Sequence, residues 1–68
     1  MEHRNMASER VRIGVTQRQM AEKLGVSEST LVRYERNNDI IPPAILKKSA
    51  EIFGCSVNYL LDLTEERM

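Results

Sequence analysis

The chain has 68 residues and no net charge, and 41% of its residues are hydrophobic while only 4% are aromatic. This length suits one small domain with a modest core, and the ample aliphatic residues favour an all-α fold. One cysteine excludes an internal disulfide, and one cysteine with one histidine provides too few ligands for a zinc site. We therefore expect no metal, no other cofactor, and a protein suited to a reducing cytosol.

No apolar run is long enough to span a membrane, and the first residues, MEHRNM, lack the apolar centre of a signal peptide. The sequence also shows no nucleophile–base pair, carboxylate pair or glycine-rich phosphate loop, so we expect neither an enzyme nor a small-molecule site. The predicted organisation is a single domain over residues 1–68, with its core at about 5–63 and a charged tail at 64–68.

The charges are distributed unevenly along the chain. Residues 4–36 contain seven basic and four acidic side chains, whereas residues 37–68 contain three basic and five acidic ones. A basic half backed by a mildly acidic half is compatible with a DNA-binding face. Mixed charge is also typical of any solvated surface, so the charge distribution alone does not distinguish a DNA-binding face from an ordinary surface.

A first helix is predicted from about Asn5 to Ile13, and Gly14 would end it. The residues that share one face at helical spacing are Met6, Ala7, Arg10 and Ile13.

A second helix is predicted from Gln17 to Leu24. Thr16 would be its N-cap, and Gln19, three residues later, completes a capping box. Gly25 would end the helix. The inward residues would be Met20, Ala21 and Leu24.

A third helix is predicted from Glu28 to Arg36, after the N-cap residue Ser27. Its inward residues would be Leu31, Tyr34 and Glu35. Residues 37–39 read as a polar turn, and Ile40 and Ile41 would pack beneath it.

The fourth and fifth helices are predicted at about Pro43–Phe53 and Val57–Leu63. Proline is tolerated in the first turn of a helix, although Pro42 offers no capping side chain. Gly54 would end the fourth helix and Ser56 would cap the fifth. The apolar anchors would be Leu46, Ala50, Phe53, Leu60 and Leu61.

The second and third helices, joined by a short turn at Gly25, can cross at a steep angle. Ala21 is small enough for the third helix to pass close to it. Apolar residues on both helices would lock this crossing. The residues left on the outer face of the third helix are Glu28, Ser29, Val32 and Arg33.

This pattern strongly resembles the helix-turn-helix of lambda-repressor-like (Cro-type, XRE-family) regulators. The residues that carry the resemblance are Gln17, Met20, Ala21, Leu24, Gly25, Val26, Ser27, Leu31, Tyr34 and Glu35. The flanking runs Glu9–Gln17 and Phe53–Leu61 are also similar to that family, so the resemblance covers about Asn5 to Leu63.

The resemblance implies a compact five-helix domain that binds double-stranded DNA in the cytoplasm of a bacterium, from a bacterial or phage gene, and that is nucleoid-associated when bound. It also implies a transcriptional regulator, of which a phage or mobile-element repressor is the expected type. The third helix would lie in the major groove.

Carried over residue by residue, the resemblance divides the DNA contacts into two sets. Gln17 would contact a phosphate, Ser27 would contact a phosphate or cap the third helix, and Arg36, Asn37 and Asn38 would meet the backbone beyond that helix. Base edges would be read by Glu28, Ser29, Val32 and Arg33. For Arg33 the alternative is a plain surface charge, and for Glu28 it is stabilisation of the helix N-terminus. Arg10 and Glu35 match the family's internal ion pair.

One recognition helix covers few bases, so we expect a homodimer on a near-palindromic operator. The expected dimer interface lies around the fifth helix and consists of Cys55, Val57, Tyr59, Leu60 and Leu63, with a core position as the alternative for Leu60.

Two other hypotheses stay open at this point. The same fold serves in protein-interaction modules, including antitoxins that bind a toxin. The chain could also be the DNA-binding part of a longer regulator, because its ending TEERM suits either a terminus or the start of a linker.

Overall fold

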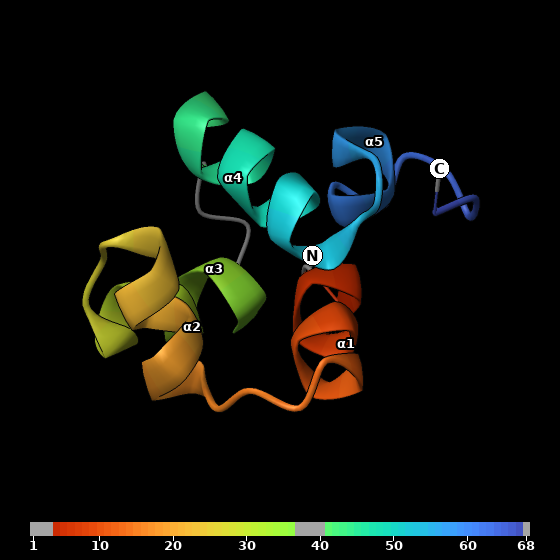
Figure 1. Ribbon diagram of the computed structural model, residues 1–68. Coiled ribbons are helices and arrows are strands. Elements are labelled where there is room, and N and C mark those ends of the chain that lie inside the picture. The colour runs from red at the N-terminus through yellow and green to blue at the C-terminus, as the bar shows by residue number, and fades with distance from the viewer. Residues whose placement is uncertain (1–3, 37–40, 68) are drawn as a thin grey trace.

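The computed structural model describes residues 4–36 and 41–67 of the chain. Within these ranges it contains five helices and no strand, in the order α1 (Arg4–Arg12), α2 (Gln17–Leu24), α3 (Glu28–Arg36), α4 (Pro43–Phe53) and α5 (Val57–Leu60) (Figure 1). The predicted all-α fold is confirmed. Figure 1 shows α2 and α3 together on one side, α4 and α5 on another, and α1 packed beside them. None of the described helices is long and apolar enough to cross a membrane.

The caps of α2 agree with the prediction. Thr16 Oγ1 accepts a hydrogen bond from the Gln19 N–H at 3.0 Å, and Gln19 Oε1 accepts one from the Thr16 N–H at 2.8 Å. Gly25 ends the helix with φ of 72°, and its N–H donates to the carbonyls of Ala21 and Glu22. Residues with a side chain rarely adopt this left-handed backbone conformation, which explains why a glycine stands here.

The ends of α1 and α5 differ from the predicted ones. α1 begins and ends one residue earlier than expected, although the Ile13 N–H still donates to the Glu9 carbonyl at 3.1 Å. α5 ends at Leu60 and not at Leu63, because Asp62 adopts a positive φ of 60° that breaks the helical path. Leu63 is consequently carried outward, with 71% of its surface exposed.

The bounds of α3 and α4 are as predicted. Ser27 Oγ accepts from the Thr30 N–H at 3.1 Å and caps α3. Pro42 precedes α4 without a side-chain capping bond. Ile41 is buried, whereas the predicted turn at 37–39 and Ile40 lie outside the described residues.

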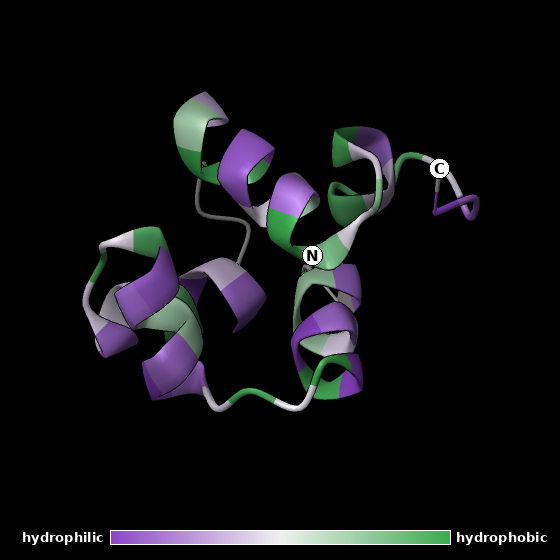
Figure 2. Cartoon of the chain, viewed as in Figure 1, coloured by the Kyte–Doolittle hydropathy of each residue, from purple (hydrophilic) through white to green (hydrophobic). Residues whose placement is uncertain are grey.

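The core draws on all five helices. Four apolar side chains have no exposed surface, namely Met6, Met20, Leu31 and Leu60. The remaining buried hydrophobic residues are Ala21, Leu24, Tyr34, Ile41, Leu46, Phe53 and Cys55. Hydrophilic residues of α2 and α4 face the viewer in Figure 2, so these two helices turn a polar side to solvent.

Ser49 is a core residue that the sequence pattern missed. It is fully buried on α4, and its hydroxyl has no hydrogen-bond partner among the described residues. Ala50, which was predicted to face inward, is only partly buried. The buried face of α4 therefore includes Leu46 and Phe53 as predicted, with Ser49 in place of Ala50.

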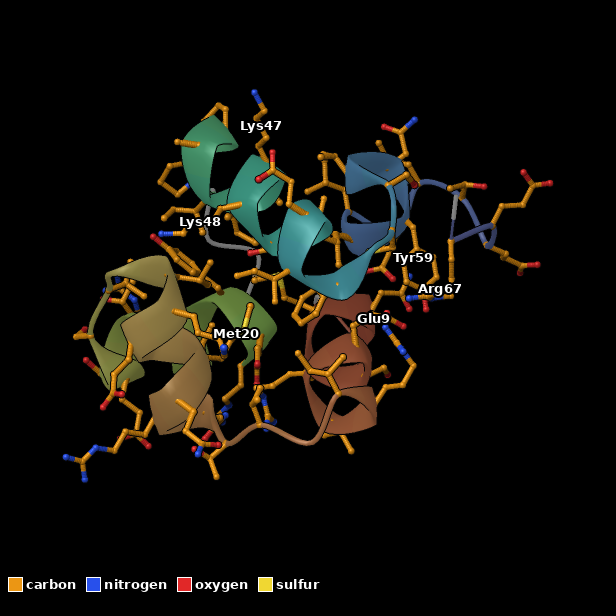
Figure 3. The ribbon with its side chains drawn as sticks, in the orientation of Figure 1. Glu9, Met20, Lys47, Lys48, Tyr59 and Arg67 are labelled. Carbon is orange, nitrogen blue, oxygen red and sulfur yellow. The ribbon has the colours of Figure 1, made fainter. Side chains whose placement is uncertain are left out.

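The chain after α5 returns to α1, and we call residues 61–67 the C-terminal strap. Arg67 donates from Nε to Glu9 Oε2 at 3.1 Å and from Nη2 to Glu9 Oε1, and Nη2 also donates to the Phe53 carbonyl at 3.1 Å. The Ser56 N–H donates to the Arg67 carbonyl. Residues predicted to form only a charged tail thus include a side chain bound to the folded body (Figure 3).

Candidate nucleic-acid interface

α2, the turn at Gly25 and α3 form a closely packed helix-turn-helix. Ala21 is 2% exposed, and its carbonyl accepts the Val26 N–H at 3.0 Å, which fixes the path of the turn. Met20, Leu24 and Leu31 are buried between the helices and the rest of the core. The outward side of α3 is therefore held in a defined direction relative to α2.

A buried carboxylate, Glu35, links α3 to two preceding segments. Arg10 Nε lies 2.8 Å from Glu35 Oε2, and Arg10 Nη1 donates to the Val15 carbonyl at 3.0 Å. The expected pair of Arg10 and Glu35 is thus present in the structure. Because the Glu35 side chain is only 4% exposed, losing its partner would leave a buried charge, at a cost of about 3–5 kcal/mol.

Gln17 takes part in the same cluster, which the sequence reasoning did not anticipate. Its Nε2 donates to Glu35 Oε1 at 3.1 Å. Gln17 therefore braces the start of α2 against α3 in the free protein, in addition to the phosphate contact expected of it. The two residues are 18 positions apart, and no pattern in the sequence marks this contact.

The outer face of α3 is polar and accessible. Glu28, Ser29 and Arg33 are exposed and Val32 is half-buried, and Arg36 is exposed at the end of the helix. A shallow hollow at the first turn is lined by Ser27, Glu28, Ser29 and Val32. The structure thus brings together, on one surface, side chains able to accept and donate hydrogen bonds and one apolar side chain.

Ser27 is largely occupied by local bonds. Besides accepting from the Thr30 N–H, its Oγ donates to Thr30 Oγ1 at 2.8 Å and lies 3.2 Å from Ser29 Oγ. Its hydroxyl stabilises the first turn of α3, and a phosphate contact would have to replace or share these bonds. Asn37 and Asn38, the other expected backbone contacts, lie outside the described residues.

The residues expected at a dimer interface fall into two groups. Cys55 and Leu60 are buried within the monomer, at 8% and 0% exposure, so their side chains serve the core. Burial and the neighbouring Glu9 carboxylate raise the pKa of the Cys55 thiol. Val57 and Tyr59 are half-buried and Leu63 is exposed, which leaves these three able to contact another chain.

A shallow depression adjoins this second group, lined by Asn5, Tyr59, Asp62, Leu63, Thr64 and Glu65. Asn5 Nδ2 donates to the Tyr59 carbonyl at 2.7 Å, which joins the start of α1 to α5 there. Val11 on α1 is a further exposed hydrophobic residue, 65% exposed, that the sequence reasoning did not single out.

Within residues 4–36 and 41–67, no group of three or more histidine, cysteine, aspartate or glutamate side chains could hold a metal ion. The charged side chains with shifted pKa values lie at the C-terminal strap instead. Hydrogen bonds from Arg67, opposed by burial and assisted by Arg12, lower the pKa of Glu9. The same bonds raise the pKa of Arg67.

Comparison with known proteins agrees with this geometry. A family model described as helix-turn-helix matches residues 6–60, which include all five helices except the first two residues of α1. No curated protein and no solved structure gave a significant match. The match spans most of the chain and includes the α2–turn–α3 unit. The chain therefore belongs to the helix-turn-helix family of lambda-repressor-like, XRE-type DNA-binding regulators.

Proposed function

We propose that this DNA-binding regulator is a sequence-specific repressor of phage or mobile-element type that reads the major groove with α3. The observation that carries the proposal is the bracing of α3 by Glu35, which accepts hydrogen bonds from Arg10 and Gln17 while the opposite face of the helix stays accessible. A recognition helix has to hold its orientation while only its outer side chains meet base edges.

The proposed base-reading residues are Glu28, Ser29, Val32 and Arg33. Arg33 would form a bidentate contact to guanine, worth about 1–3 kcal/mol of base discrimination. Val32 offers methyl groups for apolar contact. The proposed phosphate contacts are Gln17, Ser27, Arg36, Asn37 and Asn38, which would fix the register of α3 without reading sequence.

We propose that two copies bind a near-palindromic operator, with their recognition helices about 34 Å apart. Val57, Tyr59 and Leu63 would supply apolar surface for the contact between copies, because all three lie on or just after α5 and retain exposure, and Tyr59 and Leu63 line the same depression. The site of action would be the cytoplasm of a bacterial cell, at the nucleoid.

Selection of bound duplexes from a random pool tests this function. We expect a near-palindromic consensus whose half-site spacing matches one DNA turn, and affinity that falls steeply with salt as phosphate contacts release counterions. A pool that yields no consensus, together with no affinity for duplex DNA at low salt, would reject the regulator and favour the protein-interaction module of the same fold.

A further inference from the structure

The hollow at the start of α3 places a carboxylate beside an apolar side chain. Glu28 and Val32 are four residues apart on one helix, so they lie on the same face, and both line the hollow with Ser27 and Ser29. Glu28 is exposed, and within the described part of the chain its carboxylate has neither a hydrogen-bond donor nor a cation as its partner. Among the described residues, no internal interaction therefore occupies this carboxylate.

An unpaired carboxylate on a DNA-facing helix needs a donor, because the phosphates repel it. The major-groove edge of cytosine carries an N4 amino donor, whereas thymine presents its O4 acceptor at the same position. A carboxylate therefore attracts cytosine and repels thymine. The C5 position of a pyrimidine lies next to N4 or O4 on the same edge, where an apolar side chain contacts a methyl group.

We infer that Glu28 and Val32 together form a subsite for 5-methylcytosine in double-stranded DNA. Glu28 accepts the N4 amino group, and the C5 methyl group enters the hollow against Val32. This inference rests on the proposed function and adds to it a chemical modification that regulates the same interface: methylation of the operator strengthens binding.

The two interactions predict an order of affinity among three bases. Burial of one additional methyl group corresponds to about fourfold tighter binding of 5-methylcytosine than of cytosine. Thymine has the methyl group but presents an acceptor to the carboxylate, and a wrong base of this kind costs about tenfold or more. Neither residue alone gives this order, since a methyl-binding side chain without the carboxylate would favour thymine equally.

The first experiment locates the base pair that residue 28 contacts. Sites are selected from a random pool by the wild-type protein and, separately, by Glu28→Gln. The position at which the base preference changes identifies the contact, because glutamine both donates and accepts. We expect cytosine at this position for the wild type and a relaxed preference for the variant.

The second experiment compares duplexes that carry cytosine, 5-methylcytosine or thymine at that position, by equilibrium binding at one fixed salt concentration. For the wild type we expect affinity to decrease from 5-methylcytosine through cytosine to thymine. Val32→Ala should abolish the gain from the methyl group and keep cytosine above thymine. Glu28→Gln should reduce the difference between cytosine and thymine.

Two matched variants control for the change of residue type. Val11→Ala removes an exposed valine from α1, and Glu51→Gln neutralises an exposed acid on α4, and both should leave the three affinities in the wild-type ratio. The wild-type comparison itself requires no substitution, so a variant that fails to fold does not block the test.

The inference is overturned if the methyl group leaves wild-type affinity unchanged or lowers it, if Val32→Ala retains the gain, or if Glu28→Gln selects the wild-type consensus. In each of these outcomes a wild-type consensus still exists, so the proposed regulator stands. Only the lack of any consensus, together with no affinity for duplex DNA at low salt, would reject both.

Discussion

Arg67 donates hydrogen bonds to both carboxylate oxygens of Glu9, a side chain that is 4% exposed and 58 positions away in sequence. Arg12 Nε donates to Glu9 Oε1 at 3.0 Å, and the guanidinium groups of both arginines donate to the Phe53 carbonyl. Glu9 and the two arginines that bind it thus join α1, the end of α4 and the C-terminal strap. Arginine suits this site because its planar group can serve an acid and a carbonyl simultaneously.

This cluster predicts a specific dependence of stability on pH. Because Arg67 lowers the pKa of Glu9 in the folded state, Glu9 stabilises the fold above its ordinary pKa of 4.5, and this contribution disappears as the pH falls through the lowered value. Arg67→Met should therefore lower the melting temperature more at pH 7 than at a pH below the folded-state pKa of Glu9, where the substitution still removes the bond to the Phe53 carbonyl but no longer an ion pair. Melting followed by circular dichroism between pH 2 and pH 7 measures this, with Arg18→Met on the exposed side of α2 as the control. An equal loss at both ends of the range would show that Arg67 stabilises the fold through packing or its bond to the Phe53 carbonyl and not through the charge of Glu9.

The buried pair at Glu35 predicts a contrast between two acids of α3. Glu35→Ala leaves Arg10 without its acid partner and removes the acceptor of Gln17, so the free energy of unfolding should fall by about 3 kcal/mol. Glu28→Ala removes only an exposed charge near the helix N-terminus and should cost under about 1 kcal/mol. Urea denaturation gives both values. A larger loss for Glu28→Ala would reject the bracing role of Glu35.

The buried hydroxyl of Ser49 predicts a substitution that stabilises the protein. Ser49→Ala removes a polar group that has no partner among the described residues, and the free energy of unfolding should rise by about 1 kcal/mol. The control is Ser8→Ala on the exposed side of α1, which should change it by less than about 0.5 kcal/mol. A destabilised Ser49→Ala would mean that the hydroxyl finds a partner in solution.

Arg33 predicts a loss of specificity without a loss of fold. Arg33→Ala should weaken binding to the selected operator by about tenfold or more and relax the preference at one guanine, while the circular dichroism spectrum is retained. Lys47→Ala is the matched loss of one positive charge, since Lys47 extends from α4 away from α2 and α3 (Figure 3). An Arg33→Ala protein with the wild-type base preference would exclude base reading by this residue.

Local signals in the sequence predicted most of the fold. Thr16 with Gln19, and Gly25 after Leu24, gave the bounds of α2 as the structure has them, because helix caps depend on residues only a few positions apart. The predicted end of α5 was wrong because aspartate tolerates a positive φ but does not require one, so the sequence did not mark Asp62 as the residue that breaks the helix. Ser49 was missed because a core predicted from hydrophobic residues alone leaves out a polar residue, even where the helical spacing places that residue inward.

The candidate site likewise has a part that local sequence signals predicted and a part that depends on helix packing. The outer face of α3 followed from its helical spacing. The bond from Gln17 to Glu35 joins residues 18 positions apart, and that from Arg67 to Glu9 joins residues 58 apart, so both depend on how the helices pack. No single-sequence pattern records such a distance, and only the family resemblance brought Arg10 and Glu35 together in advance.

The C-terminal strap also bears on the order in which the molecule assembles. The α2–turn–α3 unit is closed by contacts between near neighbours in sequence, which form early because little chain entropy is lost. The bonds of Arg67 to Glu9 and of Asn5 to Tyr59 close loops of 58 and 54 positions, and they require α1, α4 and α5 to be in place first. We therefore expect the strap to dock after the rate-limiting step of folding. Interactions absent from that step slow unfolding and leave the folding rate unchanged, so the strap would extend the lifetime of the native state.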